Sequence, residues 1–285
     1  MEILLASDMG FCFGVRRAVE MMEEATETVG EMVSLGSIVH NPQVVDRLKE
    51  QGIDVITAVD QVDARPVAIT AHGVSESVVR ELEQRGVPVV DTTCPIVTRS
   101  QQWAKRLAED GFAVIVFGDP NHKEVRGVLG WAPGKVFAVT SVDEIDSLPG
   151  DLPSKVGVLS QTTETEAHFA EFVRALLERR MDQISELRVI NTLCNATTSQ
   201  QAAARELAHD VDLMVVVGGR ESANTRHLAE VARDEGVETY HVESADDIDA
   251  AWLTGHERVG VTAGASTPDD AIDAVVARLR ELAPA

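Results

Sequence analysis

Short runs of apolar, mostly β-branched residues alternate with longer stretches of helical periodicity along the whole chain. The runs predict strands at Ile3–Ala6, Val67–Thr70, Val87–Val90, Ala113–Phe117, Val156–Ser160, Leu213–Val217 and Val259–Thr262. The longer stretches predict helices at Val15–Thr28, Pro42–Gln51, Ser75–Arg85, Thr98–Asp110, Glu164–Arg180, Thr198–His209, Ala223–Glu235 and Pro268–Leu282. This alternation is typical of parallel sheets joined by crossover helices, so we expect an α/β fold.

Many of the predicted strands run directly into a polar or glycine-rich turn that is followed by a helix. The fragments are AITAHGVSES, VVDTTCPIVT, VIVFGDPNHKE, VLSQTTETE, VVVGGRESAN and GVTAGASTPD. In open α/β sheets, ligands bind at the carboxyl ends of the strands. The unusual polar residues of this chain therefore stand where a site is expected.

Composition excludes several classes of protein. The 285 residues include 25 Lys and Arg against 47 Asp and Glu, a formal charge of −22, and 44% of the residues are hydrophobic. Apolar content is too high for a disordered chain, and the charge is unsuited to gripping a nucleic acid backbone. No apolar run is long enough for a membrane span, and the N-terminus MEILLASDMG has no signal-peptide pattern. We therefore expect a cytoplasmic protein with no membrane or nucleic acid partner.

The three cysteines, Cys12, Cys94 and Cys194, are spaced by 94 − 12 = 82 and 194 − 94 = 100 residues. Each follows or lies near a predicted strand and precedes a predicted helix. This recurrence predicts three similar α/β lobes that each give one cysteine to a shared centre, although residue-by-residue self-similarity is weak. We expect a first lobe at residues 1–94, a second at 95–193, a third at 194–266 and a C-terminal helix at 267–285.

A cysteine at the start of a helix is suited to metal binding or nucleophilic chemistry, because the exposed amides there lower the pKa of its thiol. One cysteine alone would more simply be a small buried apolar residue, but all three share this context. Structural zinc prefers four ligands in local C-x-x-C pairs, which are absent. An iron-sulfur cluster held by three cysteines would leave one iron able to bind substrate as a Lewis acid. A zinc hydrolase, a structural metal protein and a non-catalytic small-molecule binder remain the alternatives.

Three histidines, His40, His72 and His122, lie in turn-like contexts beside Gly or Pro. Hydroxyl and amide side chains stand at two further predicted helix starts, with Ser222 and Asn224 in GGRESAN and Ser266 in TAGASTPD. Each could be a simple helix cap. Several helix N-termini with hydroxyl and imidazole donors could instead hold a diphosphate without a Lys or Arg clamp.

Glu124 follows His122 by two residues, and Thr162 and Thr163 end a predicted strand. In a shared pocket, a carboxylic acid and threonine hydroxyls could relay a proton. The chain contains neither a P-loop nor a G-x-G-x-x-G motif, so a reductase built on it would take its electrons from a source other than bound NAD(P)H.

These fragments, in order, resemble the 4-hydroxy-3-methylbut-2-enyl diphosphate reductase family, the last enzymes of the methylerythritol phosphate route to isoprenoids. The resemblance covers nearly the whole chain and includes all three cysteines. Its motifs are GFCFGVRRAVE, VHNPQVVDRL, AHGVSE, DTTCPIVT, HKEVRG, SQTT, NTLCNATTSQQ, GGRESANT and GVTAGASTPD.

The resemblance implies a trefoil of three α/β lobes, with mainly parallel sheets, around a central 4Fe-4S cluster that keeps one iron open to substrate. Its implied ligands are Cys12, Cys94 and Cys194. It also implies reductive removal of the substrate's allylic hydroxyl, giving isopentenyl diphosphate and dimethylallyl diphosphate. The implied diphosphate-binding residues are His40, His72, His122, Ser222, Asn224 and Ser266.

For proton delivery, the resemblance implies Glu124 with Thr162 and Thr163, assisted by His122. It implies a ferredoxin or flavodoxin type of electron donor. One position departs from the family, which often has two adjacent serines before the asparagine, whereas this chain has Ala223 as the second. One diphosphate hydrogen bond would then be missing or replaced.

Overall fold

The predicted alternation of strands and helices is present in the computed structural model, which describes residues 1–283. These residues form three four-stranded sheets in which every strand pair is parallel. In spatial order, sheet A contains β1 (Glu2–Leu5), β12 (Arg258–Ala263), β10 (Leu213–Val217) and β11 (Glu238–Val242). Sheet B contains β3 (Ile53–Ile56), β2 (Met32–Leu35), β4 (Val67–Ile69) and β5 (Val89–Asp91). Sheet C contains β7 (Val136–Val139), β6 (Ala113–Phe117), β8 (Lys155–Ser160) and β9 (Glu186–Val189).

Every predicted helix is present within a few residues of its predicted ends. The α-helices are α1 (Phe13–Val29), α2 (Pro42–Glu50), α3 (Glu76–Arg85), α4 (Pro95–Glu109), α5 (Lys123–Leu129), α6 (Glu166–Arg180), α7 (Asn195–Ala208), α8 (Ala223–Asp234) and α9 (Asp269–Leu282). Only α5 was not predicted, because it is two turns long and has no extended periodic pattern. No helix among residues 1–283 is long and apolar enough to span a membrane.

The missed strands are β2, β3, β7, β9 and β11. Most lie at a sheet edge, where one side faces solvent and the apolar run is interrupted, as in ELRV of β9. The central strands β6 and β10 are buried at every position, so their sequences AVIVF and LMVVV are unbroken apolar runs. Burial on both faces therefore makes β6 and β10 evident in the sequence, whereas the central β2 was missed because its run MVSL is short and contains a serine.

All three sheets have the same strand order. A first strand lies between the second and the third, and the fourth pairs with the third. Sheets B and C take four consecutive strands, but sheet A takes β10, β11, β12 and then β1 from the N-terminus. The three-lobed α/β fold is thus confirmed. Assigning the strand at Ile3–Ala6 to the lobe at 1–94 was wrong, because β1 can complete the sheet only where β12 offers a free edge.

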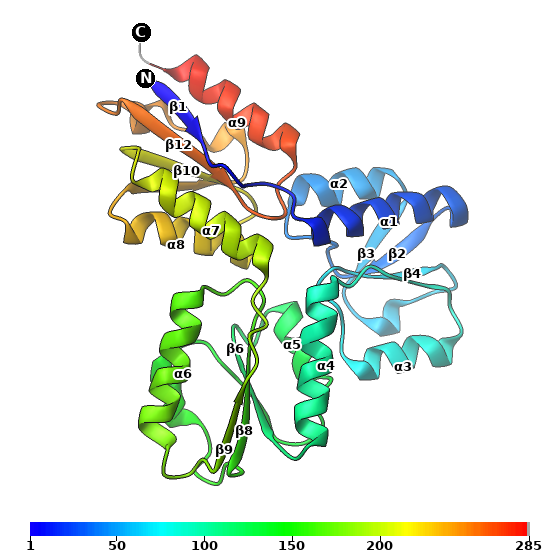
Figure 1. Cartoon of the computed structure of the whole chain (residues 1–285). Coiled ribbons are helices and arrows are strands. Elements are labelled where there is room, and N and C mark those ends of the chain that lie inside the picture. Colours follow the sequence, from blue (N-terminus) through cyan, green and yellow to red (C-terminus); the bar gives the residue numbers. More distant parts are fainter. Residues whose placement is uncertain (284–285) are drawn as a thin grey trace. The chain divides into compact units, whose positions relative to one another are not determined.

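The chain folds into two compact units. The first contains residues 1–16, 39–47 and 195 onward, with sheet A, and the second contains residues 17–38 and 48–194, with sheets B and C. In the first unit, α9 covers one face of sheet A and α7 and α8 cover the other (Figure 1). Alternate residues of β10 face the two sides, so Val215 packs near Val275 of α9 and Val216 packs near Leu228 of α8. The C-terminal helix is therefore part of the core of sheet A, and not a separate element.

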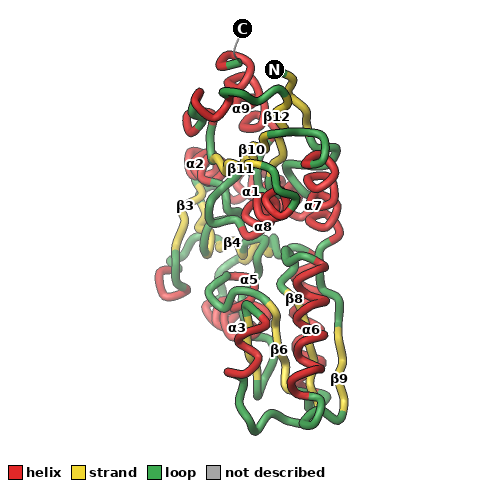
Figure 2. Tube along the Cα trace, turned by 90° about the vertical axis from the view of Figure 1, so that its left-hand side faces the viewer, coloured by secondary structure: helices red, strands yellow, loops and turns green. Residues whose placement is uncertain are grey.

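Sheet C of the second unit is covered in the same way. Phe117 of β6 stacks on Phe172 of α6 with ring centroids 4.7 Å apart, while Val114 and Val116 face α4 and α5. Figure 2 shows α6 running lengthwise beside β8 and β9. In sheet B, Leu82 of α3 packs against Val33, Val67 and Ile69.

A glycine follows the first strand of every sheet. These are Gly36, Gly118 and Gly218, and their N–H groups donate to the last carbonyl of the second strand at 2.7, 2.9 and 2.9 Å. All three have positive φ angles, of 90°, 157° and 147°. The second and third strands lie on opposite sides of the first strand. The side on which new strands are added to the sheet therefore switches at the first strand. Such a switch point is where ligands bind in open α/β sheets.

Candidate active site

The three cysteines occupy the same place in the three lobes, at the end of the loop that follows the fourth strand and directly before a helix. Their N–H groups donate to the carbonyl oxygens of Ala265, Ala71 and Thr162, for Cys12, Cys94 and Cys194, at 3.1, 3.0 and 2.8 Å. Each acceptor is the second residue after the third strand of its sheet. Every cysteine loop is therefore tied to the neighbouring loop that follows the third strand.

The repeat is closest between the loops of Cys94 and Cys194. Residues 91–100 and 191–200 have the same class of burial at every position. Thr92 and Thr192, two residues before each cysteine, donate their hydroxyls to Ile69 and Ser160, the last residues of the third strands, at 2.6 and 2.7 Å. The sequence shows the cysteine recurrence, whereas these matching contacts appear only in the structure.

The sulfur atoms lie among helix N-terminal amides. Cys12 Sγ accepts a hydrogen bond from the N–H of Val15 at 3.4 Å, and Cys94 is the N-cap of α4. Burial nevertheless raises the pKa of the Cys94 thiol, against the lowering effect of the Ile96 and Val97 amides, and the charges of Cys194 and Glu124 raise it further. Our expectation of a lowered pKa was thus wrong for Cys94, because desolvation outweighs the helix terminus.

Six of the predicted substrate and proton-transfer residues occupy two equivalent positions in the three lobes. The fourth residue after the first-strand glycine is His40, His122 or Ser222, and the third residue after the third strand is His72, Thr163 or Ser266. Glu124 and Asn224 are likewise equivalent, each two residues after His122 or Ser222. Sequence comparison within the chain misses this pattern, because the equivalent residues differ in type.

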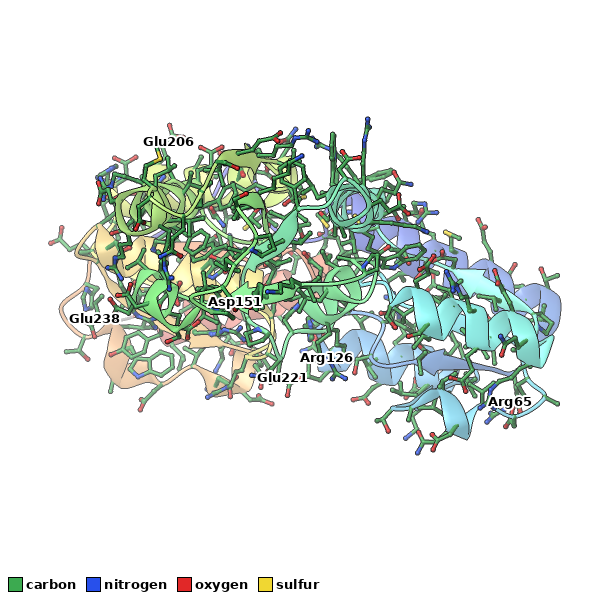
Figure 3. All side chains as sticks on the ribbon, turned by 90° about the horizontal axis from the view of Figure 1, so that it is seen from below. Arg65, Arg126, Asp151, Glu206, Glu221 and Glu238 are labelled. Carbon is green, nitrogen blue, oxygen red and sulfur yellow. The ribbon has the colours of Figure 1, made fainter. Side chains whose placement is uncertain are left out.

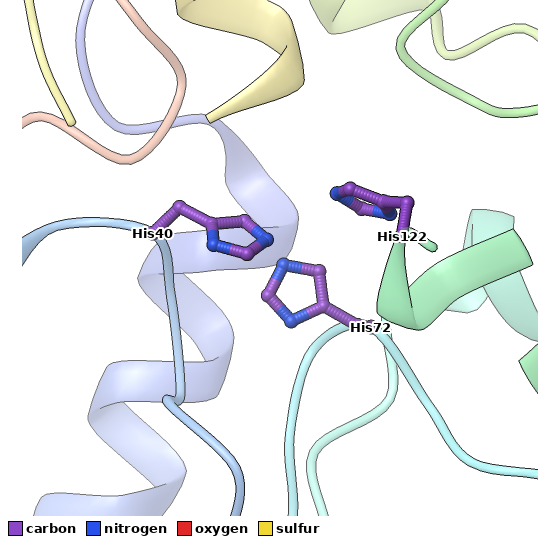
Figure 4. A group of neighbouring side chains, drawn as sticks. All are labelled: His40, His72 and His122. Carbon is purple, nitrogen blue, oxygen red and sulfur yellow. The ribbon is translucent and has the colours of Figure 1, made fainter. Parts of the chain in front are cut away.

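His72 and His122 lie side by side in the second unit. Their rings meet edge to face, with centroids 5.6 Å apart and planes at 80° (Figure 4). His122 is buried and is the N-cap of α5, where its Nδ1 accepts the Glu124 N–H at 3.2 Å. Because Nδ1 is an acceptor, the neutral ring carries its proton on Nε2. His122 can therefore act as a hydrogen-bond donor at Nε2 without being charged.

Glu124 is the one carboxylic acid among the predicted site residues, and it is buried. Its side chain is 3% exposed, and its two carboxyl oxygens accept from the Thr162 N–H at 2.7 Å and the Thr162 hydroxyl at 2.8 Å. Burial raises its pKa to about 7, against the lowering effect of these two hydrogen bonds, and the charge of Glu164 raises it slightly more. A carboxyl that is half protonated near neutral pH can both give and take a proton there.

Gln161 is a buried polar residue that the sequence analysis missed. Its Oε1 accepts the Asp119 N–H at 3.1 Å, and its Nε2 donates to the Thr163 hydroxyl at 3.2 Å. A Cβ atom at Gly118 would lie 2.5 Å from Gln161 Cβ, so the close approach requires glycine there. Gln161 thus links the turn that leads to His122 with the turn that carries Thr162 and Thr163. Its place in SQTT, directly after a buried strand, was the available signal.

The first unit contains His40, Ser222, Asn224, Ser266 and Cys12. Asn224 donates to Gln200 Oε1 at 3.0 Å, and Gln200 donates to the Gly10 carbonyl at 2.8 Å. Asn224 Oδ1 is buried and has no hydrogen-bond partner among the described residues. A buried acceptor of this kind costs free energy unless a ligand donates to it, which makes Asn224 a suitable contact for a hydroxyl group.

Two further features of the first unit shape the region around Ser222. Ser222 is the N-cap of α8 and accepts the Thr225 N–H at 3.3 Å, and Ala223 beside it is buried. A Cβ atom at Gly219 would lie 2.2 Å from the His40 carbonyl oxygen, so glycine allows the loop before α2 (labelled His40 in Figure 4) to approach. None of the predicted substrate-binding residues is Lys or Arg.

The pKa of Glu124 is directly measurable. We expect the infrared carbonyl band of the protonated Glu124 side chain to disappear with a midpoint near pH 7, instead of near the ordinary value of 4.5. The Glu124→Gln variant should lack this band, and Glu166→Gln, which alters an exposed glutamate, should retain it. A midpoint below pH ~5.5 would mean that the Thr162 hydrogen bonds outweigh burial.

Comparison with known proteins gives consistent matches. Residues 3–280 match the family model described as LytB protein. The chain is 43% identical to 4-hydroxy-3-methylbut-2-enyl diphosphate reductase of Dehalococcoides mccartyi strain CBDB1 over 282 residues, which is 99% of each chain. It is 45% identical to the protein of the same name from Geobacter sulfurreducens over 281 residues, which is 99% of this chain and 98% of that one.

Two solved structures share the fold. The E-1-hydroxy-2-methyl-but-2-enyl-4-diphosphate reductase of Plasmodium falciparum has a TM-score of 0.92 and 28% identity, covering 98% of this chain and 87% of that one. A second structure, (E)-4-hydroxy-3-methyl-but-2-enyl diphosphate reductase, has a TM-score of 0.70 and 36% identity, covering 99% of this chain and 100% of that one. With the three-lobed fold and the repeated cysteine loops, these matches show that the chain belongs to the LytB protein family.

Proposed function

We propose that this protein is an oxidoreductase that converts 4-hydroxy-3-methylbut-2-enyl diphosphate to isopentenyl diphosphate and dimethylallyl diphosphate. The reaction takes up two electrons and two protons, breaks the allylic C–O bond and releases water. Full-length relatives carry the name of this reductase. The structural observation that best supports the proposal is the buried Glu124–Thr162 pair, whose carboxyl has a pKa of about 7.

The cofactor in this proposal is a 4Fe-4S cluster bound by Cys12, Cys94 and Cys194. The donor set fits, because the described chain offers three partly buried thiols that form no disulfide, each on a loop tied to its neighbour by the same hydrogen bond. The charge of Cys194, which raises the pKa of the Cys94 thiol, also fits, since bringing thiolates together is unfavourable unless a cation is present. When bound, such a cluster supplies electrons and one open iron that polarises a hydroxyl group.

The diphosphate group of the substrate would be held by neutral donors. His40, His72, His122, Ser222, Asn224 and Ser266 provide imidazole, hydroxyl and amide groups at the ends of strands and the starts of helices. A helix N-terminus favours an anion through its exposed N–H groups and its dipole. Such short-range donors would be needed in a chain with a charge of −22, since its long-range field repels anions.

Glu124 would deliver protons through Thr162, with His122 assisting. The Thr162 hydroxyl donates to the carboxylate form of Glu124, and it can accept from the carboxylic acid form without any change in position. Thr163, which receives a hydrogen bond from Gln161, lies on the same turn and would complete this group. Burial keeps a large fraction of Glu124 protonated at neutral pH, which is what a general acid requires.

The partners in this proposal are a small diphosphate substrate and a ferredoxin or flavodoxin type of electron donor, in the cytoplasm. Nothing in the described chain resembles a nucleotide-binding loop that would hold NAD(P)H. Electrons would therefore arrive from a separate protein.

Anaerobic purification tests the cofactor. We expect brown protein with about four irons and four labile sulfides per chain, and we expect replacement of any one cysteine by serine to lower both contents and turnover. Stoichiometric zinc in a colourless protein would instead support a zinc hydrolase or a structural metal protein. Full turnover in all three serine variants would contradict the proposal.

The acid role of Glu124 is tested by Glu124→Gln. We expect kcat to fall by about 10²–10⁴-fold, the usual contribution of general acid catalysis, while the iron content and the substrate Kd change little. In the wild type, kcat should fall as pH rises through about 7, because the carboxyl loses its proton there. Glu166→Gln is the matched control. A Gln variant with near-normal kcat would remove Glu124 from the mechanism.

The positioning role of Gln161 is tested by Gln161→Leu, which removes both of its side-chain hydrogen bonds. We expect kcat to fall about tenfold, which corresponds to ~1.4 kcal/mol, with little change in Kd. The upper limb of the pH profile should shift to higher pH, because a looser Thr162 turn stabilises the Glu124 carboxylate less. Gln161→Glu, which keeps an acceptor for Asp119, should retain more activity, and the exposed Gln51→Leu should behave as wild type. An unchanged pH profile in Gln161→Leu would exclude this role.

A further inference from the structure

A cavity with a volume of about 380 Å³ lies at the carboxyl ends of three neighbouring strands of sheet B. Leu35 and Gly36 line it at the end of β2, Thr57 follows β3, and Thr70 follows β4. The chain passes from β2 to β3 on one side and returns to β4 on the other, so the cavity stands at the switch point of this sheet. No candidate active-site residue is among its lining residues, although the hydroxyl of Thr70 in the lining lies 3.5 Å from His72 Nδ1.

The wall of the cavity is held in place from outside. The carbonyl oxygen of Val74 accepts from Trp131 Nε1 at 2.9 Å and from Gln101 Nε2 at 3.2 Å. Val74 lies between Gly73 and Ser75, which also line the cavity. A ligand would therefore meet a wall that is already ordered, which lowers the entropic cost of binding.

The charge of the cavity is opposite to that of the chain. Its lining contains Lys123 and Arg126 of α5 and no carboxylate, although the chain has 47 acidic and 25 basic residues. These two cations are three residues apart and lie on the same face of the helix. The Lys123 ammonium reaches Gly36, where a Cβ atom would lie 3.2 Å from Nζ.

Arg126, which is labelled in Figure 3, is exposed. It forms no ion pair with any residue in 1–283. By contrast, arginines such as Arg65 and Arg188 pair with neighbouring carboxylates at 2.6 and 2.9 Å. In so acidic a chain, a guanidinium without a carboxylate partner at the mouth of a cavity is available to an anion from solution.

The remaining lining is of two kinds. The apolar side chains are those of Leu35, Val59, Val74 and Val78. The hydroxyl groups are those of Thr57, Thr70 and Ser75. We propose that this cavity is a second ligand site that binds a phosphate monoester carrying a small apolar group. A phosphate monoester has a charge between −1.5 and −2 at neutral pH, which is complementary to the Arg126 guanidinium, and its oxygens match the fork of an arginine. This proposal does not depend on the proposed reductase activity.

The test uses phenyl phosphate as the probe and the holoenzyme, handled without oxygen and without a reductant. Isothermal titration calorimetry at low ionic strength should show one saturable equivalent of phenyl phosphate. Arg126→Gln should weaken this binding at least about tenfold, the usual loss for a charge-assisted hydrogen bond. Arg174→Gln is the matched control, because it makes the same charge change at an exposed arginine outside the cavity.

A second variant tests the cavity by size. Ala58 is exposed and lines the cavity, so Ala58→Phe should fill the space without disturbing the core, and should also weaken binding about tenfold or more. Circular dichroism checks that each variant is folded, and Arg126→Gln retains the test if Ala58→Phe is not.

Four outcomes would overturn the proposal. They are no saturable binding up to about 10 mM phenyl phosphate, equal losses in Arg126→Gln and Arg174→Gln, unaltered binding in both cavity variants, and displacement of phenyl phosphate by 4-hydroxy-3-methylbut-2-enyl diphosphate. In the last case the probe occupies the substrate site. If Arg126→Gln slows reduction by an acidic electron-transfer protein and phenyl phosphate does not bind, the cations serve a protein partner instead.

Discussion

One backbone hydrogen bond recurs in all three lobes, and the candidate site depends on it. The N–H of each cysteine donates to the second residue after the third strand, so the cysteine loop and the neighbouring turn are held as one piece. That turn carries His72, Thr163 or Ser266 as its next residue. The bond is possible only because the third and fourth strands are parallel neighbours, which brings their carboxyl ends to the same edge of the sheet. The position of each cysteine next to a polar turn therefore follows from the strand order, which is the same in all three sheets.

Two opposing effects set the chemistry of Glu124. Its burial disfavours the carboxylate, whereas the two hydrogen bonds from Thr162 favour it, and the result is a pKa of about 7 in place of 4.5. The same competition acts at Cys94, where burial outweighs the amides at the start of α4. In both cases the local contact alone predicts the wrong direction, because the cost of desolvation depends on how completely the rest of the lobe encloses the group.

The candidate anion-binding groups of this acidic chain are of two kinds, uncharged donors and a pair of basic side chains. The candidate diphosphate-binding residues are uncharged donors at strand ends and helix starts, which act at short range in a strongly acidic protein. The cavity beside α5 is the exception, since Lys123 and Arg126 face it without a carboxylate in its lining. Helix α5 connects the two regions, because His122 caps its N-terminus and Glu124 lies on the same two turns as these cations.

The sequence by itself determined the α/β class, most of the central strands, nearly all the helices and the positions where polar turns follow strands. It could do so because a strand buried on both faces needs an unbroken apolar run, and helix periodicity and caps are local. The cysteine recurrence also predicted the three lobes, and the motifs indicated the family. Only the tertiary structure decided that β1 completes sheet A, that α9 packs on that sheet, that Gln161 joins two turns and that the Cys94 pKa is raised. Each of these depends on contacts between residues far apart in the chain, where strand pairing, enclosure and desolvation are set by the fold as a whole.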